Sequence, residues 1–189
     1  MSSAFPSPYA LPLAPRLQAR LAGGFYAVAL LTAVYAEFIN PPAMGATAIA
    51  LAVGCYVVVT VLLYAVLRPV HPLIALAATV MSLAGLLLDA IRWQPHDINA
   101  GMTLHGVFCV LVGWLLFRSM FVPRLLGILM GFAGLVWLLY LIPTLVLRIA
   151  PYNSFAGLLG EGLPMLWFLF VGIGDPHSKK LYESSEVVS

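Results

Sequence analysis

The stretch from Met102 to Gly131 constrains the fold of this chain more than any other. It contains an apolar helix, a short turn that holds Arg118 and Arg124, and a second apolar helix opened by Pro123. Arginine is costly inside the hydrocarbon of a bilayer, whereas the apolar segments on either side are suited to it. We therefore expect two membrane-spanning helices joined by a basic turn, and this turn indicates which way the protein faces.

The composition of the whole chain agrees with a membrane protein. Of the 189 residues, 62% are hydrophobic and 8% are charged, whereas about 25% are charged in a soluble domain. The mean hydropathy of +1.02 excludes a soluble fold, because a soluble core could not hide so much apolar surface. The net charge is only +2 and the basic residues are scattered, so no nucleic acid is expected as a partner. The lipid bilayer is therefore an expected partner of this chain.

Six apolar runs are each close to the roughly 20 residues that cross about 30 Å of hydrocarbon. We predict helices at Leu21–Ile39, Ala46–Leu67, Leu73–Ile91, Asn99–Phe117, Pro123–Leu147 and Phe155–Ile173, the fifth kinked by Pro143. Short connections make consecutive helices antiparallel and adjacent. The prediction is an all-α six-helix transmembrane bundle over residues 16–174, with a flexible lead-in over residues 1–15 and a polar tail over residues 175–189.

Basic residues fall unevenly on the two sides of this predicted bundle. Seven lie in the N-terminal segment, the second and fourth connections and the tail: Arg16, Arg20, Arg68, Arg118, Arg124, Lys179 and Lys180. The opposite side holds only Arg92 and Arg148. Cytoplasmic loops of membrane proteins are enriched in Lys and Arg. Both termini are therefore expected in the cytoplasm.

Ionisable side chains within the predicted helices gather at one depth. Four of them come from four different helices and lie within roughly 10 Å of the outer boundary, at about 1.5 Å per residue: Glu37, Asp89, His105 and Glu161. Charged groups at this depth usually face the interior of a bundle, and they often mark a functional site. We expect a polar pocket that opens toward the outer leaflet.

Helical spacing supports an inward orientation of these side chains. Small and polar residues form one stripe on each of four helices: Ala78, Ser82, Gly85 and Asp89; Gly101, His105, Cys109 and Gly113; Tyr140, Thr144 and Arg148; Gly157, Glu161 and Pro164. The candidate ligand-binding residues are Glu37, Asp89, Arg92, His105, Tyr140, Thr144 and Glu161. His105 and Glu161 are the candidates for acid–base chemistry, although no catalytic residue is assigned.

Each candidate also has a purely structural interpretation. Glu37 and Asp89 are close enough to the boundary to be solvated, and Arg92 is well placed among lipid headgroups. His105 and Glu161 could form a buried pair that only holds two helices together. Cys55 and Cys109 are interpreted as small buried residues. Because no enzyme motif and no metal-thiolate spacing occurs in the sequence, we predict neither a cofactor nor a metal.

The segment Leu115–Gly127, LLFRSMFVPRLLG, resembles a family of bacterial membrane proteins catalogued as domain of unknown function 4386. Three further features match this family: the opening Arg20-Leu21-Ala22-Gly23, the upstream His105, and the segment GEGLPMLWFLFVG with Glu161 and Trp167. The resemblance covers Arg16 to Gly174. It implies a six-helix, multi-pass protein of the bacterial inner membrane, and it implies no particular activity.

Three functions are compatible with these observations. The first is an enzyme or binding protein whose outer-leaflet pocket takes a small lipophilic molecule. The second is a structural or regulatory membrane subunit, in which the polar residues only bind helices together. The third is a small carrier, although no internal repeat and no pair of broken helices supports it. The sequence assigns no substrate, no reaction and no oligomeric state.

Overall fold

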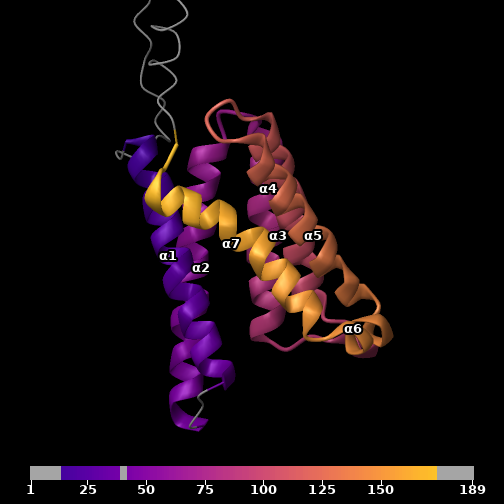
Figure 1. Cartoon of the computed structure of the whole chain (residues 1–189). Helices are drawn as coiled ribbons and strands as arrows, with labels where there is room; N and C mark the ends of the chain where they lie inside the picture. Colours follow the sequence, from indigo (N-terminus) through magenta and orange to yellow (C-terminus); the bar gives the residue numbers. More distant parts are fainter. Residues whose placement is uncertain (1–13, 39–41, 174–189) are drawn as a thin grey trace, which may run out of the picture.

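The computed structural model describes residues 14–38 and 42–173, and helices make up most of this part of the chain (Figure 1). The elements are α1 (Pro15–Phe38), α2 (Pro42–Leu67), α3 (Pro72–Ala90), the 3-10 turn η1 (Pro95–Asp97), α4 (Ala100–Arg118), α5 (Arg124–Leu138), the 3-10 turn η2 (Leu139–Leu141), α6 (Pro143–Ile149) and α7 (Tyr152–Phe170). No strand occurs within these described ranges, so the predicted all-α class is confirmed. The predicted tail and nearly all of the predicted lead-in lie outside the described residues.

Helix boundaries follow from residues that start or stop a helix. Proline occupies the first position of α3, where its missing N–H costs no hydrogen bond. The side chain of Asn99 accepts a hydrogen bond of 2.9 Å from the backbone nitrogen of Met102 and so caps the start of α4. At the other end of α4, the hydroxyl of Ser119 donates to the carbonyl of Leu116 at 2.7 Å. These local contacts place the α4–α5 turn where the sequence predicts it.

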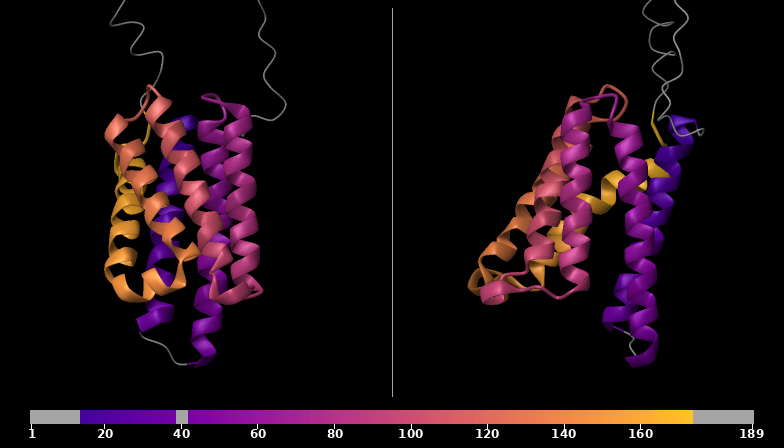
Figure 2. Two further views of the ribbon diagram at one scale, coloured as in Figure 1. Left: turned by 90° about the vertical axis from the view of Figure 1, so that its right-hand side faces the viewer. Right: turned by 180° about the vertical axis from the view of Figure 1, so that it is seen from behind.

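The six long helices form a closed ring. Each of α2, α3 and α4 packs against the helix before and after it, α5 packs against α4 and α7, and α7 returns to pack against α1. Consecutive long helices run in opposite directions, and α7 crosses the bundle obliquely from α6 to the start of α1 (Figures 1 and 2). The guanidinium of Arg20 donates to the carbonyl oxygen of Phe170 at 3.0 Å. This contact ties the beginning of α1 to the end of α7 and closes the ring.

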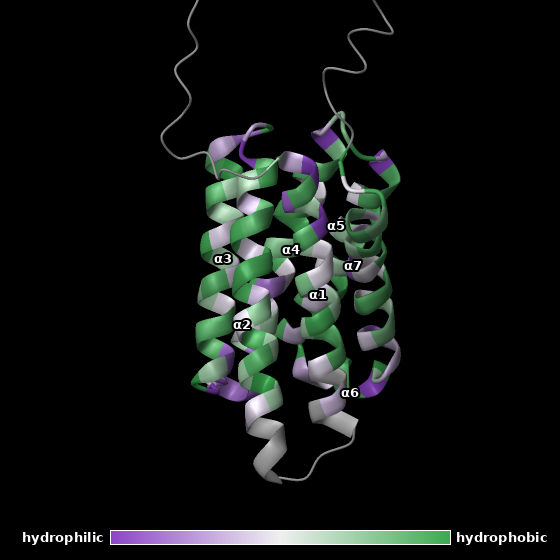
Figure 3. Ribbon diagram, turned by 90° about the vertical axis from the view of Figure 1, so that its left-hand side faces the viewer, coloured by the Kyte–Doolittle hydropathy of each residue, from purple (hydrophilic) through white to green (hydrophobic). Residues whose placement is uncertain are grey.

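Four helices in the described ranges are long and apolar enough to cross a membrane: Thr47–Leu67, Pro72–Ala90, Ala100–Arg118 and Arg124–Leu141. Large apolar side chains also cover the outside of the bundle, for example Leu73, Leu87 and Leu125, which are all well exposed. The ribbon is mostly green along the long helices, and much of the purple lies near the two ends of the bundle (Figure 3). An apolar exterior of this kind needs lipid around it, and the chain is therefore a membrane protein.

Glycine allows α4 and α5 to approach each other closely. A Cβ atom built on Gly113 would lie 2.5 Å from the backbone nitrogen of Gly131. One built on Gly134 would lie 2.7 Å from the carbonyl oxygen of Gly106. Real Cβ atoms do not approach backbone atoms this closely, so the helix backbones touch where these glycines meet. This is the role that small residues play between membrane helices.

The predicted fifth helix, Pro123–Leu147, is wrong as one continuous element. The α-helix ends at Leu138, and η2 and the separate short α6 follow. Pro143 has no N–H to donate, and its ring clashes with the carbonyl four residues earlier. Ile142, just before it, is extended at φ −121° and ψ 83°. The proline therefore breaks the helix, where the sequence analysis predicted only a kink.

Candidate functional site

A buried carboxylate lies at the centre of the ring. Glu161, on α7, is only 2% exposed. Its Oε2 atom lies 3.0 Å from Nε2 of His105 on α4, and its Oε1 accepts a hydrogen bond of 2.6 Å from the hydroxyl of Tyr56 on α2. The two predicted partners, His105 and Glu161, are thus in direct contact. Together with Tyr56 they connect three helices that are far apart in sequence.

The same histidine also contacts a cysteine. Cys109 follows His105 by one helical turn, and its Sγ lies 3.5 Å from the histidine Nε2. Cys109 is fully buried. The imidazole nitrogen of His105, the sulfur of Cys109 and a carboxylate oxygen of Glu161 therefore lie close together, within 4.8 Å of one another. These are three atoms that could bind a metal ion.

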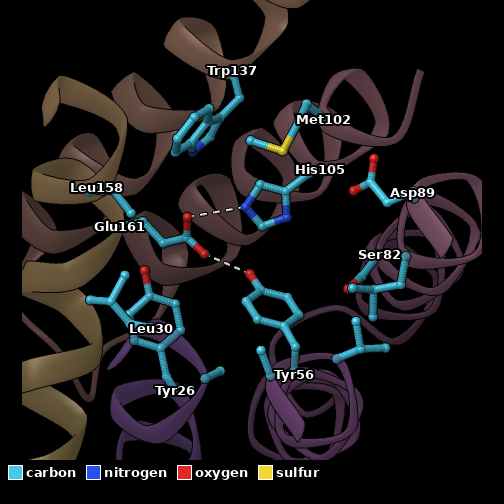
Figure 4. A pocket seen from close by; sticks show the side chains of 15 residues that line it. Tyr26, Leu30, Tyr56, Ser82, Asp89, Met102, His105, Trp137, Leu158 and Glu161 are labelled. Atoms are coloured by element: carbon cyan, nitrogen blue, oxygen red, sulfur yellow. Dashed lines mark hydrogen bonds and ion pairs between the residues drawn. The ribbon is translucent and has the colours of Figure 1, made fainter. Parts of the chain in front are cut away.

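A cavity of about 240 Å³ borders this network. All six long helices contribute to its lining, which is mostly apolar and includes Leu30, Leu86 and Leu158. Its polar side chains are Tyr26, Tyr56, Ser82, Asp89, His105, Trp137 and Glu161. Figure 4 shows these side chains around the space, with the His105–Glu161 and Tyr56–Glu161 contacts as dashed lines.

Trp137 carries a buried donor beside the carboxylate of Glu161. The indole is only 4% exposed, yet its Nε1 makes no hydrogen bond of regular geometry among the described residues. The ring lines the cavity, with its nitrogen on the side toward Glu161 and His105 (Figure 4). A buried N–H normally has a partner. One without a regular hydrogen bond at a cavity wall is therefore available to a ligand.

Asp89 lies at the opposite side of the imidazole from Glu161 (Figure 4). It lines the cavity but is exposed, and it is close enough to interact electrostatically with His105. Its carboxylate packs on Gly101, where a Cβ atom would collide with it. The structure thus brings three predicted site residues, Asp89, His105 and Glu161, to one cavity.

Other predicted candidates are not in this cavity. Arg92 is exposed in the α3–α4 connection, and Thr144 is exposed on α6. Tyr140 lies in η2 and is not part of the cavity lining. The predicted common face of Tyr140, Thr144 and Arg148 is wrong, because it assumed that the fifth helix continues past Leu138. Glu37 belongs to the last turn of α1, but its side chain lies outside the described part of the structure.

Three polar residues of the cavity lining were neither among the predicted site residues nor in the predicted stripes: Tyr26, Tyr56 and Trp137. Tyr56 shares one face of α2 with Thr60 and Tyr64, and this pattern is typical of simple packing. In the structure Tyr56 binds Glu161, and one turn away the hydroxyl of Thr60 lies 2.7 Å from that of Ser82. A tyrosine at the depth of the buried acids was the available signal. Trp137 carried no signal, because an apolar aromatic residue on a membrane helix is ordinary.

The arrangement can exchange protons and hold a polar group. A histidine and a carboxylate in contact, beside a cavity, are the groups that general acid–base catalysis uses. The apolar walls suit the rest of a lipophilic molecule.

No protein-family model, no curated protein and no solved structure matches this chain.

Proposed function

We propose that this protein binds a small lipophilic molecule within the membrane, with the polar group of the ligand held at the His105–Glu161–Tyr56 network. The observation that carries the proposal is the mostly apolar cavity that borders this network, together with the indole N–H of Trp137, a buried donor at its wall that makes no hydrogen bond of regular geometry. A hydrogen-bond acceptor on the ligand, such as a carbonyl or hydroxyl oxygen, would satisfy this donor.

The size of the cavity limits what the ligand is. About 240 Å³ is less than the roughly 300–1,000 Å³ of sites for drug-sized ligands. The cavity therefore suits either a small molecule or the polar end of a longer one whose apolar part extends between the helices.

A Trp137→Phe variant is expected to retain less of the co-purified molecule than the wild-type protein. Phenylalanine keeps an aromatic ring against His105 and removes only the donor. A hydrogen bond is worth roughly 0.5–1.5 kcal/mol, so the affinity should fall by about 2- to 13-fold. The measurement is mass spectrometry of the molecules extracted from protein purified in mild detergent.

Trp167 provides the matched control for this experiment. Its Nε1 is also buried without a regular hydrogen bond, but Trp167 is not part of the cavity lining. Trp167→Phe should therefore leave retention unchanged. Absence of any bound molecule in the wild-type protein, or equal losses in the two variants, would refute the binding function and favour a structural subunit.

We further propose that all six long helices cross the bacterial inner membrane, with both termini in the cytoplasm. α1 has 24 residues and α7 has 19, which at 1.5 Å per residue gives lengths of about 36 Å and about 28 Å, close to the roughly 30 Å of hydrocarbon that a membrane helix crosses. Both helices complete the ring beside four apolar ones. Their polar residues lower their hydropathy: Glu161 on α7 is buried inside the ring, and Arg20 lies near the start of α1, where its guanidinium binds the carbonyl oxygen of Phe170. A six-helix ring also supports membership in the family that Leu115–Gly127 resembles.

The charge distribution supports this orientation. The start of α1, the α2–α3 turn and the α4–α5 turn lie at one end of the bundle (Figure 2). Five arginines of the described ranges belong to this end: Arg16, Arg20, Arg68, Arg118 and Arg124. The opposite end has Arg92 and Arg148. The guanidinium of Arg118 also stacks 5.2 Å from the ring centre of Trp114, an arrangement typical of a membrane interface.

Reporter fusions test the orientation. A fusion after Lys180 is expected to report the cytoplasm, and one within Gln94–Ile98 is expected to report the periplasm. Phosphatase and fluorescent-protein reporters at both positions give complementary readings. If the tail fusion reports the periplasm, or if both positions report the same side, then the six-span topology is wrong.

A further inference from the structure

We infer that His105, Cys109 and Glu161 bind one divalent transition metal ion, and that zinc is the ion they suit best. The proposal goes beyond ligand binding by the cavity and does not depend on it. It rests on three different donor atoms that two helices bring to one point.

The donor set points to zinc. Imidazole, thiolate and carboxylate are the protein ligands of Zn²⁺, whereas Mg²⁺ and Ca²⁺ require oxygen ligands. His105 and Cys109 are four residues apart and so lie on one face of α4. Glu161 on α7 supplies the third ligand from the opposite side.

The distances between the donor atoms also fit. Zinc bonds of about 2.0–2.1 Å to nitrogen, 2.0–2.2 Å to oxygen and 2.3 Å to sulfur, at tetrahedral angles, separate the donor atoms by roughly 3.3–3.6 Å. The Sγ of Cys109 lies 3.5 Å from Nε2 of His105, and Oε2 of Glu161 lies 3.0 Å from the same nitrogen. The third separation, between Sγ of Cys109 and the carboxylate of Glu161, is at most 4.8 Å, so small side-chain rotations would bring all three donors to zinc distances.

Neighbouring groups hold the ligands in place. The hydroxyl of Tyr56 donates to Oε1 of Glu161, which leaves Oε2 facing the histidine. Asp89 lies on the other side of the imidazole (Figure 4) and adds negative charge beside a cation. Such contacts orient metal ligands in known sites.

Charge balance favours a divalent ion at this depth. Binding releases the thiol proton of Cys109 and any proton on the imidazole. A thiolate and a carboxylate then neutralise the two positive charges of the ion, so the ion and its three ligands together carry no net charge. Three protein ligands leave one position of a tetrahedral ion free, and the site borders the cavity. This is the pattern of a zinc site that is open to an exogenous ligand.

A cobalt titration tests the proposal. The full chain is purified in detergent, treated with a chelator and titrated with Co²⁺ alone, which takes the place of zinc and absorbs light. We expect one equivalent to produce visible bands of a tetrahedral ion and a near-ultraviolet thiolate-to-cobalt band. Zn²⁺ should abolish both signals, and elemental analysis of untreated protein should find about one zinc per chain.

Two cysteine variants decide which thiol is involved. Cys109→Ser, a nearly isosteric change, should remove the thiolate band and weaken cobalt binding at least tenfold. Cys55→Ser is the matched control, since Cys55 is the other buried free cysteine and lies on α2 away from the cluster. It should leave the spectrum unchanged. Circular dichroism and gel filtration verify that both variants are folded.

Three outcomes would overturn the metal site. They are a wild-type protein without a one-equivalent cobalt spectrum, a thiolate band that survives in Cys109→Ser, and a band that disappears equally in Cys55→Ser. The wild-type titration decides the matter even if Cys109→Ser does not fold. Since the titration requires no lipophilic ligand, its failure leaves the proposed binding function in place, and the reverse also holds.

Discussion

Replacing Gly113 with alanine is expected to destabilise the protein strongly, whereas alanine at Gly131 is expected to stabilise it slightly. A Cβ atom at position 113 would lie 2.5 Å from the nitrogen of Gly131 and 2.8 Å from the carbonyl oxygen of Gly127. Both are backbone atoms of α5, so neither can turn aside as a side chain can. The two helices would have to separate, and overpacking of this kind typically costs about 1–3 kcal/mol or more.

Gly131 lies on the same interface but has open space where its Cβ atom would be. Alanine there meets no atom within 4 Å and gains about 0.5–1 kcal/mol from its better helix propensity. The measurement is the free energy of unfolding of both variants in mild detergent, or the midpoint of their thermal transitions. We expect the free energy of unfolding to fall in Gly113→Ala and to rise in Gly131→Ala. Equal effects at the two positions would mean that α4 and α5 do not pack at the separation described.

Much of the fold could be predicted because each long helix corresponds to one apolar run. The bounds predicted for α3 and α4 differ from those observed by only one residue at each end. Proline, asparagine and arginine mark these ends in the sequence, and their physical effect is local. The early end of α5 could have been anticipated from the same rules. A proline has no backbone N–H to donate, and it disfavours the helical conformation of the residue before it.

The ring itself could not be predicted in this way. Its closure depends on α7, which crosses obliquely and packs against both α5 and α1. A membrane helix packs wherever its small residues permit, and apolar runs contain no signal for the choice of partner. On α1, a Cβ atom at Gly23 would lie 2.5 Å from the nitrogen of Leu169 on α7. This contact becomes meaningful only when both helices are in place.

The site was predicted in part for a similar reason. Depth in the membrane can be counted from the helix ends, and it identified His105 and Glu161 as neighbours although they are 56 residues apart. The rotation of each helix about its axis, and the helix that it packs against, cannot be obtained by counting residues along the sequence. Tyr56 therefore looked like a packing residue. The spacing of His105 and Cys109 was visible, but only the position of Glu161 turns this pair into a set of three ligands.

Removing either His105 or Glu161 is expected to cost far more stability than the pair contributes. In the metal-free protein, His105→Ala leaves a carboxylate that is only 2% exposed without its ion-pair partner. Glu161→Ala likewise removes the carboxylate that both the imidazole and the hydroxyl of Tyr56 contact. Breaking a buried pair from one side typically costs about 3–5 kcal/mol, because the remaining charged group cannot return to water.

The double variant distinguishes direct pairing from general damage to the helices. If the two side chains stabilise each other, His105→Ala combined with Glu161→Ala should cost less than the sum of the single changes, with a coupling of about 0.5–3 kcal/mol. The measurement is the free energy of unfolding of the four proteins after treatment with a chelator, so that loss of metal does not contribute. A second cycle combines Glu161→Ala with His71→Ala. His71 caps the start of α3 and contacts Trp114, so it shares no partner with Glu161, and these two effects should add.

The two double-mutant cycles together show whether Glu161 depends on His105 specifically. Coupling at His105 and additivity at His71 mean that the buried carboxylate depends on one specific imidazole. Additivity in both cycles would mean that His105 and Glu161 do not satisfy each other across α4 and α7. The cavity would then lack the fixed polar network on which the proposed ligand binding depends, because an orientation held by neither partner cannot position the polar group of a ligand.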